Sequence, residues 1–350
     1  MVFRFSVSAA LGLLLGCTYV LATPASSAAP AASTALPPIR SVAQPRFFGA
    51  ALNSTFLFND PIYTKLAETQ FSIFTPENEM KWEVIHPFPN VYNFTPADEL
   101  VKFSHTVNAR MRGHNFVWGS QLAPWVNDSL TATEMDIILK EHITTIMDHY
   151  KKDNIYAWDI VNEIVSDTLN VSTFKQILWT QKLGEEVVAK AFTYARAANP
   201  SVKLYINDYS IEGLGPKSDA LFGIVQGMMK DKIPIDGVGF QCHFGLGQVP
   251  ATLQQNLQRF ADLGLDVAIT ELDINTGSTS PTDAMFAQQA QDYLSVVSAC
   301  AAVKRCVSVT TWGIMDNHSW IVGKDVLPWT GTGEAKPAAT AIVQAFEAAK

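Results

Sequence analysis

From Phe47 to the C-terminus, short apolar runs alternate with longer amphipathic runs, and the alternation repeats eight times. The apolar runs are rich in β-branched and aromatic residues, which is typical of strands buried on both faces of a parallel sheet. The eight predicted strands are Phe47–Leu52, Ser72–Asn78, Met111–Trp118, Ile155–Glu163, Lys203–Tyr209, Gly237–Phe244, Val267–Ile274 and Val307–Gly313. The clearest helical patterns cover Thr133–Tyr150, Phe174–Ala198, Lys217–Lys230, Ala284–Ala302 and Ala338–Ala349. Eight strand–helix units in about 300 residues predict a (β/α)8 barrel, or TIM barrel, better than an open sheet, which usually has nearer six strands.

The composition supports one large folded domain. Of the 350 residues, 48% are hydrophobic and 17% are charged, which suits a sizeable core and argues against disorder. One barrel or two average domains would fit this length, but no second compact module remains outside the barrel, so we expect one domain over residues 46–350. The net charge of -8 and the lack of a basic stripe argue against a nucleic-acid partner.

The N-terminus is typical of an exported protein. Residues 1–22 combine a positive Arg4, an apolar stretch and small residues at a possible cleavage site, which predicts a secretory signal peptide. A membrane anchor is the alternative, but the apolar run is shorter than the ~20 residues that a span needs. Residues 23–45 are mostly Ala, Ser and Pro, and we expect a disordered leader there. The mature protein is therefore expected to be secreted, extracellular and free of the membrane.

The cysteines and sequons agree with export. Cys300 and Cys306 are close enough in sequence to form a disulfide across a short loop. Cys242, between Gln241 and His243 on an alternating strand, would face away from a site that those two line, which predicts a buried and inert thiol. Five sequons that could carry glycans begin at Asn53, Asn93, Asn127, Asn170 and Asn317.

Seven of the eight predicted strands end in polar or aromatic side chains. In α/β barrels the carboxyl ends of the strands meet at one rim, where functional groups gather. The candidate residues are Asn53, Glu77, Asn78, Lys81, His114, Trp118, Gln121, Asn162, Glu163, Asn207, Tyr209, Gln241, His243, Glu271, Asp273, Trp312 and Trp320. Carboxylates, amides and indoles in one concave site are typical of a carbohydrate-binding cleft.

Glu163 and Glu271 are the candidate pair for acid–base and covalent chemistry. Cleavage of a glycosidic bond needs one protonated and one ionised carboxyl group. Strand alternation puts Glu271 and Asp273 on one face, which predicts a hydrogen-bonded network with His243 from the preceding strand. Glu163 directly follows Asn162, so it can share that face only if it lies beyond the last paired residue of its strand. The alternative, two surface glutamates in salt bridges, fits poorly with their apolar flanks.

Other chemistries lack their sequence patterns. The seven His show no His-x-x-x-His or His-Glu-x-x-His spacing, no Cys-x-x-Cys occurs, and we expect neither a metal nor another cofactor. There is no Gly-x-Ser-x-Gly nucleophile elbow and no glycine-rich phosphate loop.

Seven blocks of the chain resemble, in order, the signature blocks of glycoside hydrolase family 10, the endo-1,4-β-xylanases, including their secreted fungal members. The blocks are Thr75–Trp82, Arg112–His114, Trp158–Glu163, Asn207–Tyr209, Asp236–Gln241, Thr270–Asp273 and Thr311–Gly313 with Ser319–Trp320. The resemblance implies endo-acting hydrolysis of xylan by a retaining double displacement, with Glu163 as general acid/base and Glu271 as nucleophile. The carboxyl groups of a retaining pair lie ~5–5.5 Å apart.

The resemblance also implies roles for the other rim residues. Asn162 would bind the 2-hydroxyl of the sugar at the cleavage point, Asn207 and Tyr209 would line the leaving-group side, and Gln241 and His243 would be partners of the nucleophile. The residues implied to grip xylose units on the non-reducing side are Glu77, Asn78, Lys81, His114 and Gln121, between the walls Trp118, Trp312 and Trp320. Gly119, Ser210 and Ile321 replace the His, Asn and Arg common in the family, which leaves subsite affinity and the preferred xylan decoration open.

Rival functions remain at this point. The nearest is a β-1,4-glucanase or an enzyme of mixed specificity, which depends on whether the cleft admits the extra hydroxymethyl group of glucose. The others are a non-catalytic barrel that binds xylan or a protein, and a structural wall protein. Xylan and xylo-oligosaccharides are the expected partners, and the expected assembly is a monomer.

Overall fold

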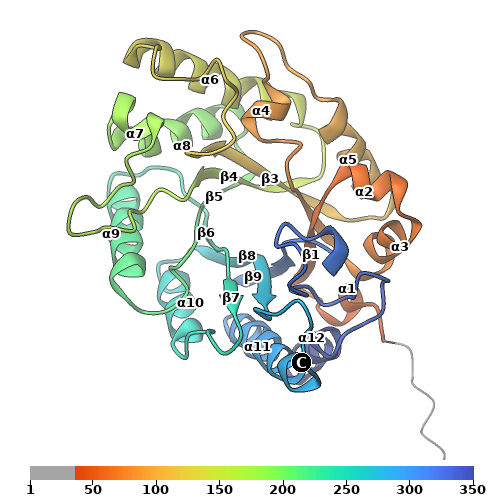
Figure 1. The fold of residues 1–350 in the computed structure, drawn as a ribbon. Coiled ribbons are helices and arrows are strands. Elements are labelled where there is room, and N and C mark those ends of the chain that lie inside the picture. The colour runs from red at the N-terminus through yellow and green to blue at the C-terminus, as the bar shows by residue number, and fades with distance from the viewer. Residues whose placement is uncertain (1–35) are drawn as a thin grey trace, which may run out of the picture. The chain divides into compact units, whose positions relative to one another are not determined.

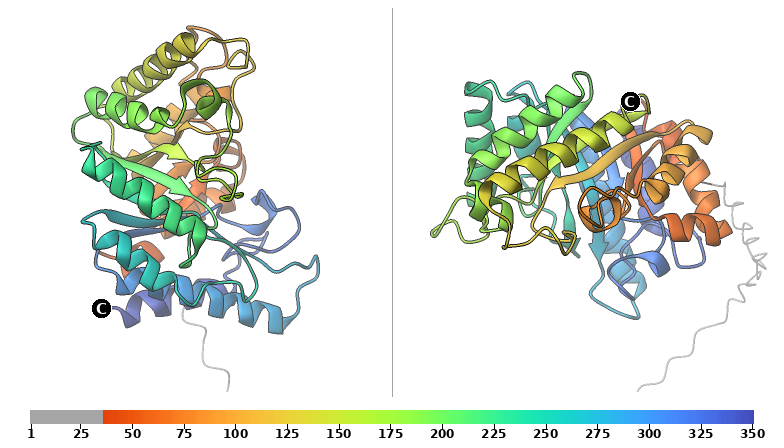
Figure 2. Two further views of the ribbon diagram at one scale, coloured as in Figure 1. Left: turned by 90° about the vertical axis from the view of Figure 1, so that its left-hand side faces the viewer. Right: turned by 90° about the horizontal axis from the view of Figure 1, so that it is seen from above.

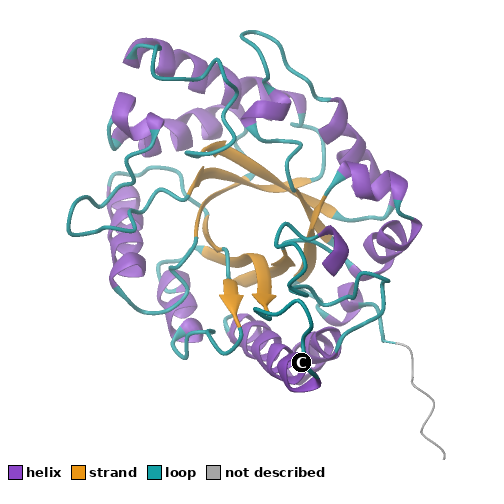
Figure 3. Ribbon diagram, in the orientation of Figure 1, coloured by secondary structure: helices purple, strands orange, loops and turns teal. Residues whose placement is uncertain are grey.

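The computed structural model describes residues 36–350, and these form a closed ring of parallel strands surrounded by helices (Figures 1 and 3). The strands are β1 (Phe47–Leu52), β2 (Ile73–Pro76), β3 (Arg110–Val117), β4 (Ile155–Asn162), β5 (Lys203–Asp208), β6 (Gly237–Phe240), β7 (His243–Gly245), β8 (Asp266–Asn275) and β9 (Cys306–Thr311). Their order is β6-β5-β4-β3-β2-β1-β9-β8-β7, and the pairing of β6 with β8 closes the ring. The predicted (β/α)8 barrel is confirmed.

The helices pack on the outside of the ring, as the two side views in Figure 2 show. They are α1 (Ile39–Val42), α2 (Ser54–Asn59), α3 (Pro61–Gln70), α4 (Trp82–Ile85), α5 (Thr95–Thr106), α6 (Ala132–His149), α7 (Leu178–Leu183), α8 (Glu186–Ala198), α9 (Pro216–Lys230), α10 (Leu253–Ala261), α11 (Asp283–Ala302), the 3-10 turn η1 (Asp316–His318) and α12 (Pro337–Ala348). Local chemistry fixes several starts. Thr131 and Glu134 form a capping box on α6, and proline occupies the first turn of α9 and α12. Within residues 36–350, no helix is both long and apolar enough to cross a membrane.

Most predicted strands lie within two residues of the observed ones, but the run 237–244 does not form one strand. It is divided into β6 and β7 because Cys242 adopts a φ of +67°, outside the extended region. The predicted helix 174–198 likewise begins only at Leu178 and is divided into α7 and α8. Phe174 pairs with Val165 in a loop, and Gly184, with a φ of +66°, separates α7 from α8.

The leader was expected to extend to residue 45, and this is wrong for its last ten residues. Residues 36–45 include α1, whose Ile39 is fully buried in the hydrophobic core. Arg40 on the same helix donates to the backbone oxygens of Val107 and Asn108 at 2.9 and 3.0 Å. A few apolar and hydrogen-bonding residues thus anchor a segment whose composition alone predicts disorder. The signal peptide and the rest of the leader lie outside the described residues.

The predicted disulfide and the predicted burial of Cys242 are confirmed. Cys300 at the end of α11 and Cys306 at the start of β9 form a disulfide. Cys242 is a free cysteine and is fully buried.

Candidate active site

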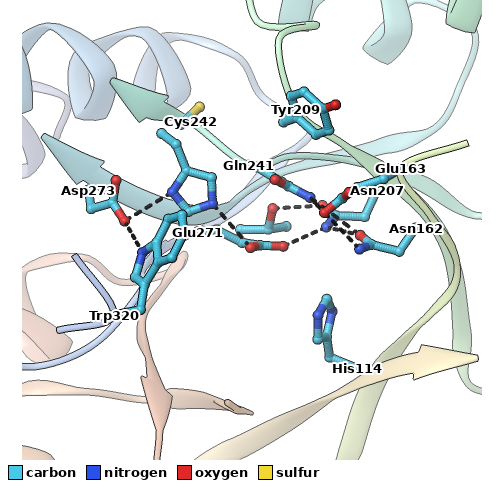
Figure 4. A network of polar contacts seen from close by, with 12 residues as sticks. His114, Asn162, Glu163, Asn207, Tyr209, Gln241, Cys242, Glu271, Asp273 and Trp320 are labelled. Carbon is cyan, nitrogen blue, oxygen red and sulfur yellow. Dashed lines mark hydrogen bonds and ion pairs between the residues drawn. The ribbon is translucent and has the colours of Figure 1, made fainter. Parts of the chain in front are cut away.

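A cavity of about 590 Å³ opens at the carboxyl ends of the strands. Of the candidate residues at the strand ends, all but Asn53, Asn207 and Asp273 line it. The lining residues are Glu77, Asn78, Lys81, His114, Trp118, Gln121, Asn162, Glu163, Tyr209, Ser210, Gln241, His243, Glu271, Trp312 and Trp320. Residues that are far apart in the sequence thus converge on one concave surface, part of which Figure 4 shows.

The carboxylate of Glu271 is held from two sides. Its Oε1 accepts a hydrogen bond from Asn207 Nδ2 at 2.7 Å, and its Oε2 lies 3.3 Å from His243 Nε2 (Figure 4). Burial by itself raises the pKa of Glu271, but the hydrogen bond from His243 and the nearby imidazoles outweigh burial, so the pKa lies below its ordinary value. The site therefore keeps Glu271 ionised.

His243 lies between two carboxylates, as predicted from strand alternation. Its Nδ1 is 3.0 Å from Asp273 Oδ2, which also accepts a hydrogen bond from the indole of Trp320 at 2.8 Å. Burial favours the neutral imidazole, but Asp273 and Glu271 outweigh it and raise the pKa of His243 to about 10. His243 is therefore an imidazolium at neutral pH. The predicted network of Glu271, His243 and Asp273 is confirmed.

Glu163 reaches the cavity through an irregular backbone conformation. Strand β4 ends at Asn162, and Glu163 follows with a φ of +56°, in the left-handed region. Its backbone N–H still donates to Asn207 O at 2.8 Å. The left-handed residue ends the alternation of the strand, so Asn162 and Glu163 both line the cavity. Sequence reasoning had required this departure from a regular strand.

A chain of amide side chains connects the two carboxylates, and it changes the place expected for Asn207. Asn207 was expected to line the leaving-group side, but it is fully buried and donates to both Asn162 Oδ1, at 2.8 Å, and Glu271. Gln241 was expected to be a partner of Glu271, and its backbone oxygen accepts the N–H of Glu271 at 3.0 Å, while its side-chain Nε2 donates to Glu163 Oε1 at 3.3 Å.

A second polar cluster lies where β2 and β3 end. Lys81 Nζ donates to Gln121 Oε1 at 2.7 Å and to Asn78 Oδ1 at 3.2 Å, and lies 5.1 Å from the ring centre of Trp118. Burial lowers the pKa of Lys81. It also raises the pKa of Glu77, whose Oε2 accepts a hydrogen bond from Asn53 at 3.1 Å. Donors, acceptors and an indole face are thus fixed in place beside the two carboxylates.

Sequence reasoning missed the buried group that supports His114. Its Nδ1 lies 3.0 Å from Asp159 Oδ2, and Asp159 also accepts two hydrogen bonds from Arg112. Burial opposes ionisation of Asp159, but the charge of Arg112 and the contact with His114 leave its pKa below the ordinary value. The available signal was Asp159 itself, the one charged residue in the apolar run from Ile155 to Ile160.

A second missed group surrounds Glu163 and Tyr209. Lys175 Nζ lies 3.6 Å from Glu163 Oε2 and donates to the Tyr209 hydroxyl at 2.9 Å. Lys217 lies 3.5 Å from the ring centre of Tyr209, and both lysines pair with Asp167. Lys175 could not be found from the sequence because it falls in the segment predicted as helix.

The arrangement can perform proton transfer and nucleophilic attack by carboxylates. One carboxylate is held ionised by fixed donors, and a second lines the same cavity among amides and indoles that suit sugar hydroxyls and ring faces. Among residues 36–350, no cluster of three or more His, Cys, Asp or Glu has the geometry to hold a metal ion.

A (β/α)8 barrel with this pair of glutamates at its catalytic rim defines a glycoside hydrolase. Comparison with known families agrees, because residues 38–345 match the model of glycosyl hydrolase family 10. The chain belongs to this family.

The similar proteins include fungal enzymes. An endo-1,4-beta-xylanase of Agaricus bisporus is 38% identical over 309 residues, which cover 86% of this chain and 91% of that protein. The crystal structure of a glycosylated family 10 endo-beta-1,4-xylanase from Gloeophyllum trabeum matches with a TM-score of 0.84 and 44% identity, over 89% of this chain and 99% of that one. Xylanase 10B from Thermotoga petrophila, solved in complex with xylobiose, matches with a TM-score of 0.84 and 32% identity, over 89% and 97% of the two chains.

Proposed function

We propose that the protein hydrolyses internal β-1,4-xylosidic bonds of xylan with retention of configuration. The observation that carries the proposal is the geometry of Glu271, whose carboxylate is held by Asn207 and His243 in the same cavity as Glu163. Family 10 membership and the similarity to xylanases support it. Retention requires a carboxyl separation of ~5–5.5 Å, which we propose for this pair.

In the first step, a Glu271 oxygen attacks the anomeric carbon of the sugar and forms an ester bond to it. The glycosidic carbon–oxygen bond breaks, and Glu163 gives its proton to the departing oxygen. The hydrogen bonds from Asn207 and His243 keep Glu271 ionised and oriented before the attack. The products of this step are a shortened chain with a free hydroxyl group and a glycosyl-enzyme.

In the second step, Glu163 acts as a base. It takes a proton from a water molecule, the water oxygen bonds to the anomeric carbon, and the ester bond to Glu271 breaks. Glu163 is then protonated and Glu271 ionised, as at the start. Two inversions at one carbon give net retention.

The remaining lining residues are proposed to bind the xylan chain. Asn162 contacts Glu163 and accepts a hydrogen bond from Asn207, the residue that also donates to Glu271, and this place suits a hydrogen bond to the 2-hydroxyl of the reacting sugar. The cluster of Lys81, Asn78 and Gln121 suits further hydroxyls on the non-reducing side. Indole walls and the ring of Tyr209 would pack on sugar faces.

Secretion, a monomeric state and glycosylation are also proposed. Of the five sequons, those at Asn93, Asn127, Asn170 and Asn317 are exposed. Asn53 is a poorer acceptor because its amide donates to Glu77 and its oxygen caps α2.

The test is a time course on β-1,4-xylan with the purified protein, following product sizes by chromatography and the first anomer by NMR. We expect short xylo-oligosaccharides released as β-anomers. First release of α-anomers would exclude a covalent role for Glu271. Faster hydrolysis of carboxymethylcellulose than of xylan would favour a β-1,4-glucanase. A folded protein that releases no reducing sugar from either polymer would favour a non-catalytic binding barrel.

A further inference from the structure

The strand that carries Gln241 and His243 is interrupted between them. β6 ends at Phe240, β7 begins at His243, and Cys242 has a φ of +67°. Both short strands pair with β8, but Phe240 aligns with Ile269 and His243 with Asp273. Gln241 and Cys242 therefore lie opposite three residues of β8, Thr270 to Leu272, and the strand register shifts by one residue. We call this interruption at Cys242 the kink.

The kink determines how the candidate nucleophile is held. The backbone N–H of Glu271 donates to Gln241 O at 3.0 Å, and that of Asp273 donates to Cys242 O at 3.4 Å. The next residue, His243, then places its imidazole between the side chains of Glu271 and Asp273. In a regular strand the register would be different, and His243 would not lie opposite Asp273.

The backbone N–H of Cys242 donates a hydrogen bond to a side chain from another loop. Glu212, between β5 and α9, accepts this N–H on its Oε1 at 3.0 Å. Glu212 is only 5% exposed, and Cys242 is fully buried. An unpaired N–H at this depth would be costly, and a left-handed non-glycine residue persists only where its surroundings hold it. Figure 4 shows the Cys242 side chain directed away from the carboxylates.

We propose that Glu212 is a positioning residue for the nucleophile, because its carboxylate fixes the Cys242 kink and thereby the register that brings His243 to Glu271. The predicted loss of turnover rests on the proposed function. The predicted exposure of the Cys242 thiol on release of the kink does not, because it is the same whatever the protein hydrolyses.

The experiment compares Glu212→Gln, Glu212→Asp and Glu212→Leu with the parent protein. Gln keeps an oxygen acceptor at the same reach, Asp withdraws the acceptor by one methylene, and Leu removes it. The matched control is Asp292→Leu, because Asp292 is also 5% exposed and accepts the backbone N–H of Gly247 at 2.8 Å, without touching the kink. The measurements are kcat and KM on xylohexaose and on an aryl β-xylobioside, and the rate of Cys242 labelling by a thiol reagent, located by peptide mapping.

We expect Glu212→Leu to lose at least tenfold in kcat on both substrates with KM changed less than threefold, and to label at Cys242 at least tenfold faster. Glu212→Asp should lie between Leu and the parent, and it decides the question if the Leu variant does not fold. Glu212→Gln and Asp292→Leu should stay within threefold of the parent in both measurements. The proposal is overturned if Leu or Asp leaves kcat and labelling unchanged, if Gln fails to restore them, or if only xylohexaose is affected. If the parent protein proves inactive, the proposed function fails, and labelling alone decides the role of Glu212.

Discussion

At the scale of single residues, the site gives one carboxylate a fixed charge. Glu271 is held ionised by His243, whose own proton is held by Asp273. Glu163 contacts an amide donor and the ammonium group of Lys175 at longer distances, 3.3 and 3.6 Å. The two glutamates therefore have different surroundings, which a division into nucleophile and acid/base requires.

Substitution of the two glutamates should separate their roles. Glu271→Ala is expected to abolish turnover of every substrate. Glu163→Ala should lower kcat/KM on xylan by ~10²–10⁴-fold, since protonation of the leaving oxygen is lost. For an aryl xylobioside whose leaving group needs no proton, kcat/KM reports the attack by Glu271 and should change little. Steady-state kinetics on both substrates, with circular dichroism as the control for folding, check this. Equal losses by Glu163→Ala on the two substrates would contradict the assignment.

The proton on His243 should make stability depend on pH. Its pKa in the folded protein, about 10, exceeds the ordinary value of 6.5, so the folded state binds this proton more tightly than the unfolded state. The resulting stabilisation is fully present below pH 6.5 and is lost as the pH rises toward 10. At about 1.4 kcal/mol per pKa unit the change is on the order of a few kcal/mol.

Chemical denaturation of the parent and of His243→Gln across this pH range measures the effect. Lysines and tyrosines titrate in both proteins, so the difference between the two isolates His243. A free energy of unfolding that falls equally in both would exclude the expected linkage.

At the scale of the elements, strands β5, β6 and β8 approach one another closely beneath the cavity, and this packing positions Asn207. A Cβ on Gly239 of β6 would lie 2.2 Å from Asn207 Oδ1 and 2.9 Å from Thr270 Cγ2. Asn207 accepts a hydrogen bond from Thr270 and donates to Glu271, so displacement of Asn207 would reach the nucleophile. Gly239 is thus required because any side chain would clash with Asn207 and Thr270, and not because its backbone conformation excludes other residues.

Gly239→Ala should therefore damage both stability and activity. We expect a loss of ~1–3 kcal/mol from overpacking and at least a tenfold fall in kcat. The matched control is Gly223→Ala on the exposed surface of α9, where an added Cβ has no neighbour within 4 Å. That change should stabilise the protein by ~0.5–1 kcal/mol through helix propensity and leave kcat unchanged. Denaturant unfolding and initial rates test the pair, and an active, stable Gly239→Ala would disprove the tight packing.

At the scale of the whole molecule, the candidate active site and the disulfide lie at opposite ends of the barrel. The cavity lies at the carboxyl ends of the strands, whereas the disulfide joins the last turn of α11 to the first residue of β9, at the amino end. The disulfide closes a loop with a sequence separation of 6, which in the chain-entropy model stabilises by roughly 2 kcal/mol.

The double substitution Cys300→Ala, Cys306→Ala should lower the free energy of unfolding by about that amount, with kcat at 25 °C unchanged. Calorimetry and initial rates on xylan measure the two effects. A large fall in kcat in a folded variant would mean that the two ends of the barrel are coupled.

The sequence by itself determined the architecture and the chemical groups of this protein. Eight repeats of an apolar run and an amphipathic run specify strands and helices through local periodicity, and nearly every predicted strand lies within two residues of its place. The polar ends of those strands predicted the lining of the cavity, because parallel strands in a closed barrel present their carboxyl ends on one side. The same strand ends supplied the pair Glu163 and Glu271, and the family blocks implied the role of each.

Only the tertiary structure decided which way the side chains at the irregular positions point. Period-two alternation predicts faces only while the backbone stays extended, and Glu163 and Cys242 leave that region with φ of +56° and +67°. Hydrogen bonds from distant segments meet the chain at such positions, as that of Glu212 with the Cys242 N–H does, and no local sequence pattern predicts them. The burial of Asn207, the contact of the Gln241 side chain with Glu163 and the approach of Lys175 from a loop likewise depend on packing between distant segments.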